Sequence, residues 1–149
     1  MILFLSFDGV LHSAGQTQQH FDRLPLLENW LRTHDEIQLV ISSKWRKKMP
    51  FEDICHIFSD DIRHRVIGMT PLIADETHDE YWRLSEIFDW LNHCSADVPW
   101  LVLDDGVFPQ AFKRLVWCDP EKGLTSDELQ KLSQMKSSMV REMSACRLN

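Results

Sequence analysis

The chain has 149 residues, of which 44% are hydrophobic and 26% are charged, as in an ordinary globular domain large enough for one core. Its formal net charge of −7 argues against a general nucleic-acid-binding protein, because such a protein needs a basic face to displace counterions. One local basic cluster, which we expect to be a solvated surface, comprises Lys44, Arg46, Lys47 and Lys48.

The cysteines and the first residues bear on cellular location. Four widely spaced cysteines form neither a CxxC pair nor a zinc-binding pattern, so we expect reduced thiols. The apolar start is too short for a secretion signal, and no stretch approaches the roughly 18 apolar residues of a membrane span. These features predict a cytoplasmic protein.

The first half of the chain alternates apolar runs with helical patterns. Residues 2–7 predict a buried strand, and residues 37–41 and the shorter run 65–69 predict two more. Between the first two runs, apolar side chains recur at helical spacing near Pro25, namely Leu24, Leu27, Trp30 and Leu31. A second helical pattern follows Pro50 and comprises Ile54, Ile57 and Phe58.

The second half continues this alternation. A third helical pattern comprises Leu84, Ile87, Phe88 and Leu91. Residues 100–103 and 115–118 predict two further strands. Thr125 and Glu128 have the spacing of a capping box, which predicts a last helix over about 125–146.

Strands that alternate with helices predict a three-layer α/β/α sandwich, with a Rossmann-like, mostly parallel sheet of about five strands. We expect residues 1–149 to form a single domain. Ligands of such sheets bind beyond the carboxyl ends of the strands. The polar residues expected at that edge are Ser6, Asp8, Ser42, Ser43, Asp104 and Asp105.

These residue types suit phosphoryl transfer, which needs a nucleophile, a proton donor and positive charge near the phosphoryl oxygens. Asp104 and Asp105 could hold a hard cation, since carboxylates are the ligands that Mg²⁺ prefers. Ser42 or Ser43 could donate to a phosphoryl oxygen, and Arg83, near the start of a predicted helix, could supply the charge.

The same residues resemble the motifs of the haloacid dehalogenase-like (HAD) superfamily. Its DxDG motif is matched at every position but the first by Ser6-Phe7-Asp8-Gly9. Its Ser or Thr at a strand end is similar to Ser42-Ser43, followed by Trp45-Arg46 as in an SxWR subgroup. Arg83 resembles the third motif, and Asp104-Asp105 the paired acids of the fourth. The resemblance covers residues 1 to about 119.

The resemblance implies a role for each residue. Asp8 would be the general acid/base, and its backbone carbonyl would ligate Mg²⁺ together with Asp104 and Asp105. Ser43, or alternatively Ser42, would bind a phosphoryl oxygen, and Arg83 would neutralise the transferring group. Gly9 and Arg46 would lie on the substrate side of the site. The first motif position, here Ser6, would be nucleophile and metal ligand.

Ser6 departs from this pattern in a way that affects chemistry. A carboxylate attacks without a base, whereas a serine hydroxyl must first lose its proton. We therefore expect a Mg²⁺-dependent phosphohydrolase that is inactive or weakened, with reduced Mg²⁺ affinity, or a non-catalytic pseudophosphatase module that binds a phosphorylated ligand or protein. Three explanations stay open: Ser6 is natural, it was introduced, or it is itself a nucleophile or phosphorylation site.

The segments where HAD relatives insert cap domains are short, namely 12–24 and 69–81. We therefore expect no sizeable cap and an open site. By resemblance, such sites suit bulky phosphorylated substrates, and the SxWR pattern leans towards nucleotides or polynucleotides, which the acidic net charge opposes. His12, in the first of these segments, is expected to be a loop histidine without a role.

Overall fold

The computed structural model describes residues 1–15, 20–73, 76–94 and 97–147. Its strands are β1 (Ile2–Leu5), β2 (Gln38–Ile41), β3 (Val66–Met69), β4 (Trp100–Asp104) and β5 (Leu115–Trp117). Its helices are α1 (Leu24–Arg32), α2 (Phe51–Cys55), α3 (Asp60–Arg63), α4 (Trp82–Asn92) and α5 (Ser126–Arg147), with a 3₁₀ helix, η1 (Lys44–Lys47). The predicted strands are confirmed, with ends shifted by one or two residues.

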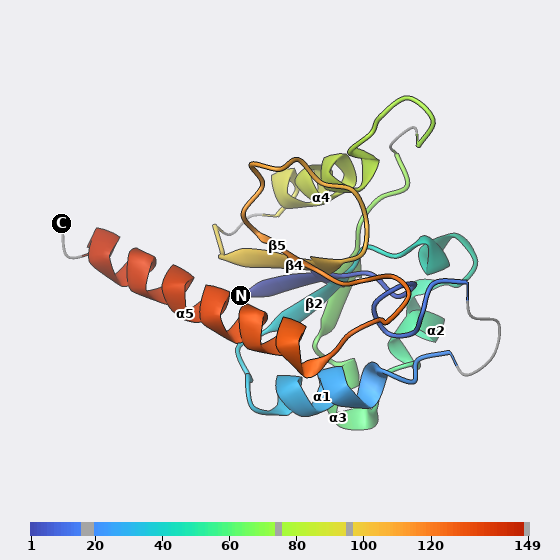
Figure 1. The fold of residues 1–149 in the computed structure, drawn as a ribbon, viewed down its shortest axis with the longest axis horizontal. Helices are drawn as coiled ribbons and strands as arrows, with labels where there is room; N and C mark the ends of the chain where they lie inside the picture. Colours follow the sequence, from blue (N-terminus) through green and yellow to red (C-terminus); the bar gives the residue numbers. More distant parts are fainter. Residues whose placement is uncertain (16–19, 74–75, 95–96, 148–149) are drawn as a thin grey trace.

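The five strands form one sheet in the order β3-β2-β1-β4-β5, and every pair is parallel. In Figure 1, α4 lies on one face of the sheet, and α1, α3 and α5 lie on the other. This is the predicted α/β sandwich of Rossmann type. The described parts of the segments that lead from β1 to α1 and from β3 to α4 contain no helix or further sheet strand, so the chain carries no large cap.

Alternate residues of the strands pack on opposite faces, as the period of two requires. Leu3, Leu5 and Leu103 belong to the larger core cluster, which faces α1 and α5. Phe4 and Val102 belong to the smaller cluster under α4, where the indoles of Trp90 and Trp100 pack edge-on against Phe4. The face that α4 covers is therefore the face of the even-numbered residues of β1.

Two helical expectations were wrong in detail. The single helix predicted through Ile54 and Phe58 is divided into α2 and α3, because Glu28 accepts hydrogen bonds from the amide and hydroxyl of Ser59 and so starts a new helix. Ile54 and Phe58 are nevertheless both buried. Phe88, expected to face the core, is 46% exposed, because Leu84, Ile87 and Trp90 form the inner face of α4.

The last helix begins with the predicted capping box. The Thr125 hydroxyl accepts a hydrogen bond from the Asp127 amide at 3.3 Å, and the Glu128 carboxylate accepts one from the Thr125 amide at 3.2 Å. Leu129 and Leu132 anchor the first turns, whereas the C-terminal turns extend past the body of the molecule (Figure 1). None of the described helices has the length and apolar character needed to cross a membrane.

Arg65 joins the end of α1 to the sheet. Its guanidinium donates to three main-chain carbonyl oxygens, those of Leu31 at 2.7 Å, Ile37 at 3.0 Å and His34 at 2.5 Å. Carbonyls at the end of a helix lack partners within the helix, and a cation there also interacts favourably with the helix dipole. Arg65, the residue before β3, thus supplies hydrogen-bond donors to carbonyl oxygens at and just after the end of α1.

We expect Arg65→Ala to lower the free energy of unfolding by about 2–4 kcal/mol, because several buried acceptors lose a charged donor. Urea unfolding followed by circular dichroism measures this. Arg141→Ala, which alters an exposed residue of α5, is the matched control and should change stability by less than about 0.5 kcal/mol. Equal effects in the two variants would contradict the role of Arg65.

Candidate functional site

The candidate site lies where β1, β2 and β4 end. Leu5 pairs with Ile41 on one side and with Leu103 on the other, so the next residues, Ser6, Ser42 and Asp104, stand at one level. The order of strands also reverses between β1 and β4, since β2 and β3 lie beyond β1 whereas β5 lies beyond β4. A crevice at such a reversal is where sheets of this kind bind ligands.

Arg83 connects the ends of two strands. From the first turn of α4, its Nη1 donates to Ser6 Oγ at 2.6 Å and contacts both Asp104 carboxylate oxygens at 2.8 and 2.9 Å. All three residues are buried, with Asp104 fully so. The predicted set of Ser6, Arg83 and Asp104 is therefore brought together, and the Arg83 side chain also packs against Trp82.

Asp8 lies at the mouth of the site with its side chain half exposed. Its Oδ1 is 2.7 Å from His12 Nε2 and accepts a hydrogen bond from Trp45 Nε1 at 2.9 Å. Burial raises the pKa of Asp8, but these two hydrogen bonds and the nearby imidazoles of His12 and His20 together outweigh burial and leave the pKa below its ordinary value. Asp8 is thus a carboxylate at neutral pH.

Gly9 allows Asp105 to approach the backbone. Gly9 has φ +75°, and a Cβ at this position would lie 2.2 Å from Asp105 Oδ2, so only glycine fits. Burial and the neighbouring negative charge of Asp104 raise the pKa of Asp105 to about 6. Gly9 therefore permits two carboxylates, Asp104 and Asp105, to lie beside the loop that carries Asp8.

The two serines after β2 differ in their contacts. Ser43 Oγ accepts a hydrogen bond from the Trp45 amide at 3.2 Å and caps η1. Ser42 Oγ is buried and has no hydrogen-bond partner among the described residues. A buried hydroxyl without a partner is costly, so an acceptor placed beside Ser42 Oγ would stabilise the folded chain.

Arg46, predicted to lie on the substrate side of the site, is held in a buried ion pair. Its guanidinium side chain is only 1% exposed and forms an ion pair with Glu86 of α4, while its Nη1 donates to the Ser43 carbonyl at 2.8 Å. Glu86 also accepts a hydrogen bond from the Ile73 amide at 3.0 Å. Arg46 therefore fastens η1 to α4.

The oxygen atoms at this edge are of the type that a hard cation such as Mg²⁺ prefers as ligands. Burial is the main cause of the raised pKa of Asp105, and the neighbouring charge of Asp104 adds to it; a cation would relieve the repulsion between the two carboxylates. The fit is incomplete, because no three His, Cys, Asp or Glu side chains converge within the described part of the chain, and position 6 offers a neutral hydroxyl.

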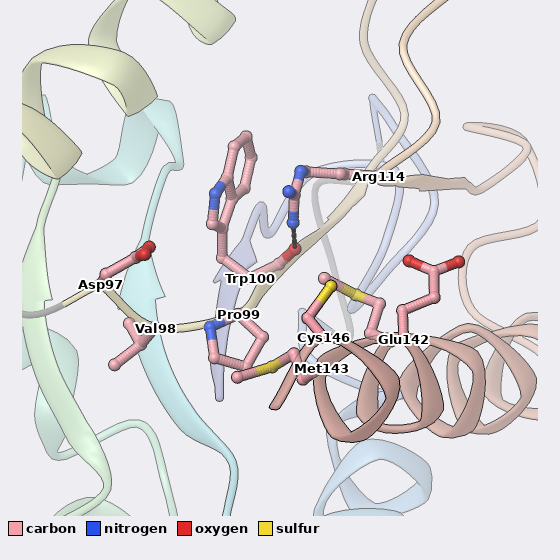
Figure 2. Close-up of a pocket in the computed structure, with 9 residues that line it drawn as sticks. Asp97, Val98, Pro99, Trp100, Arg114, Glu142, Met143 and Cys146 are labelled. Carbon is pink, nitrogen blue, oxygen red and sulfur yellow. Dashed lines mark hydrogen bonds between the residues drawn. The ribbon is translucent and has the colours of Figure 1, made fainter. Parts of the chain in front are cut away.

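Among the grooves formed by the described residues, two lie at opposite ends of the sheet. One groove of about 630 Å³ opens beside Asp8 and is lined by Ala14, Gly15, His20, Trp45, Lys48 and Met49. The other, of about 440 Å³, lies before the start of β4 against the far turns of α5, between Trp100, Arg114 and Met143 among others (Figure 2). Only the first groove adjoins the predicted site residues.

The sequence did not predict three contacts at the site. His12, expected to be a loop histidine without a role, contacts Asp8, and Trp45 also contacts Asp8. Glu86 forms an ion pair with Arg46. Glu86 follows Arg83 by three residues on the same helix, so helical spacing could have placed it near the site. No comparable spacing predicts the contact between Trp45 and Asp8, which are 37 residues apart.

We expect Gly9→Ala to destabilise the chain more than Gly15→Ala. Both glycines have positive φ, so each alanine costs roughly 1–2 kcal/mol of backbone strain, but a Cβ at Gly15 meets no described atom within 4 Å. Contact with Asp105 should add about 1–3 kcal/mol at Gly9. Equal losses in urea unfolding would mean that Asp105 does not pack against Gly9.

The raised pKa of Asp105 predicts a pH-dependent stability. Between its ordinary value of 3.8 and about 6 the carboxyl is protonated in the folded chain only, so stability falls as pH rises through this window. Asp105→Asn should therefore stabilise the chain at pH 7 but not at pH 3.5, measured by thermal unfolding with a chelator present. The control, Asp97→Asn, alters an exposed carboxylate and should change stability alike at both pH values.

Comparison with known proteins identifies the chain. The family model described as the HAD domain in Swiss Army Knife RNA repair proteins matches residues 2–129. Comparison with curated proteins and with solved structures gave no match. The match spans all five strands, Ser6, Asp8, Arg83, Asp104 and Asp105. The chain therefore belongs to the HAD domain family of the Swiss Army Knife RNA repair proteins.

Proposed function

We propose that this chain has the site of a Mg²⁺-dependent phosphohydrolase acting on phosphate groups at RNA ends, and that Ser6 leaves it inactive or strongly weakened. The observation that carries the proposal is the contact of Arg83 with Ser6 and Asp104 at the carboxyl edge of the sheet. It joins residues from three of the four motifs in one buried cluster, where a phosphoryl group would meet a fixed positive charge.

Each residue has one part in this proposal. Arg83 neutralises the equatorial oxygens of the phosphoryl group, and Ser42, whose hydroxyl has no partner among the described residues, donates to one of them. Asp8 exchanges a proton with the leaving oxygen at the mouth of the site. Ser43 Oγ accepts a hydrogen bond as the cap of η1 and keeps its own proton to donate to a second phosphoryl oxygen. Asp104 and Asp105, with the carbonyl of Asp8, would hold Mg²⁺, which would offset charge on the phosphoryl oxygens.

Ser6 is the weak point because its hydroxyl is not a base and receives a hydrogen bond from a cation. Arg83 stabilises negative charge at Oγ, but no described carboxylate or imidazole is bonded to Ser6 to remove its proton. A serine nucleophile in other enzymes depends on such a base. Because the Ser6 hydroxyl is neutral, the cation site also has one anionic ligand fewer than it would have with a carboxylate at position 6.

The groove beside Asp8 supports a nucleotide-bearing substrate. Trp45 and His20 offer aromatic surfaces there, and the exposed Lys48 offers a cation for a backbone phosphate. Stacking on aromatic side chains and contacts to phosphates are how proteins bind single-stranded RNA. A local groove of this kind operates despite the net charge of −7, because screening limits the reach of distant charges.

A second candidate is a pseudophosphatase module that binds a phosphorylated ligand or protein without cleaving it. The specific observation in its favour is that Arg83 keeps its contacts although position 6 carries a hydroxyl. A phosphate could be held by Arg83 and Ser42 with no covalent step.

We expect Ser6→Asp to raise Mg²⁺-dependent phosphate release on the order of 10³-fold or more over the unaltered chain, since it restores a nucleophile that needs no base. The measurement is phosphate release from an end-phosphorylated RNA oligonucleotide and from p-nitrophenyl phosphate. The double variant Ser6→Asp/Asp8→Asn should lose most of the gain.

Equal rates in the chain and in Ser6→Asp would contradict the argument about the nucleophile. Calorimetric titration with Mg²⁺ and a phosphate analogue separates the two functions. Binding of the analogue by both proteins, with no phosphate release from either, would favour the pseudophosphatase module.

A further inference from the structure

The two carboxylate oxygens of Asp8 have different surroundings. Oδ1 interacts with both His12 Nε2 and Trp45 Nε1, whereas Oδ2 accepts no hydrogen bond from any described residue. A carboxylate oxygen has two lone pairs, so two donors occupy Oδ1 fully. Any proton that Asp8 exchanges with another molecule is therefore carried by Oδ2.

The contact made by the second ring nitrogen of His12 shows that His12 is the donor in its hydrogen bond to Asp8. The main-chain N–H of Phe21 donates to Nδ1 at 3.2 Å, and an N–H group cannot accept. Nδ1 is therefore unprotonated, and the hydrogen of the neutral ring is on Nε2, facing Asp8. Because the His12 side chain is only 1% exposed, solvent does not compete for either nitrogen.

Phe21, whose N–H donates to His12, has a strained backbone conformation that its packing contacts maintain. Phe21 has φ +65°, which is unfavourable for a bulky residue and persists only where surrounding contacts enforce it. Its ring packs against Phe7, Trp45 and His12, with centroid distances of 5.5, 4.9 and 5.3 Å. The same contacts that hold Phe21 thus fix the imidazole of His12.

We propose that His12 and Trp45 are positioning residues that bind Oδ1 of Asp8 and reserve Oδ2 for proton transfer. The inference rests on the proposed function and names the atom that performs its proton step. Oδ2 first takes up a proton from solvent, because Asp8 is otherwise a carboxylate at neutral pH. As the phosphoryl group passes to the carboxylate nucleophile of the Ser6→Asp variant, the P–O bond of the substrate breaks with its electron pair on the leaving oxygen, which takes this proton. A water then attacks phosphorus and gives a proton to Oδ2, while the bond from phosphorus to position 6 breaks and phosphate is released.

The arrangement can be tested on the chain itself, without any activity. Long-range ¹H–¹⁵N spectra of uniformly labelled protein at pH 7 distinguish the two ring nitrogens of a histidine. We expect His12 to have a protonated Nε2 and an unprotonated Nδ1. A ring protonated at Nδ1, alone or together with Nε2, would overturn the proposal, because Nδ1 could not then accept from Phe21.

Two substitutions of His12, each made in the Ser6→Asp variant, distinguish a positioning role of His12 from a packing role. Glutamine places its amide nitrogen near the position of Nε2, so His12→Gln keeps a donor for Asp8. Asparagine reaches only the position of Nδ1, so His12→Asn keeps an acceptor for Phe21 and loses the contact to Asp8. His56→Asn, on the exposed end of α2, is the control.

We expect His12→Asn to lower kcat about 10- to 100-fold with little change in KM, whereas His12→Gln stays within about threefold of the parent. Equal losses in both, or the reverse order, would overturn the proposal in favour of a packing role. An inactive Ser6→Asp parent would count against the proposed function, and the nitrogen spectrum of the unaltered chain would still decide the inference.

Discussion

The site depends on the in-register pairing of β1 with both of its neighbours. Leu5 lies opposite Ile41 and Leu103, so three strands end together and their next side chains meet at one level. A shift of one residue in either ladder would turn a polar side chain to the opposite face of the sheet. Because α4 covers the face of Phe4 and Val102, Arg83 reaches Ser6 and Asp104 directly.

The charge balance at this edge explains how the fold persists with a serine at position 6. The Arg83–Asp104 pair is buried, and an unpaired charge there would be costly. The Ser6 hydroxyl accepts a hydrogen bond from Arg83, as a carboxylate at this position could. Unlike a carboxylate, the hydroxyl has no negative charge, which matters for a nucleophile and for a cation. Fold and chemistry are therefore separable at Ser6.

The short helix η1 links the two halves of the candidate site. Trp45 reaches Asp8 on the loop after β1, while Arg46 reaches Glu86 on α4, one turn beyond Arg83. The adjacent Ser43 caps η1 and offers its carbonyl to Arg46. The polar groups of the Trp-Arg pair therefore link η1 to the loop that carries Asp8 and to α4.

The sequence by itself determined the strands, the parallel sheet and the residues at its carboxyl edge, because apolar runs and strand-end polar residues are local signals. Ser6, Asp8 and Asp104 are predicted in this way, whereas Arg83 is predicted from its place near the start of a helix and from its resemblance to a motif. Tertiary structure alone decided that Arg46 is buried against Glu86, that Ser43 Oγ accepts a hydrogen bond whereas Ser42 Oγ has no partner among the described residues, and that His12 contacts Asp8. Those outcomes depend on which donor lies within hydrogen-bond distance of which acceptor, and packing between segments far apart in the chain sets that distance.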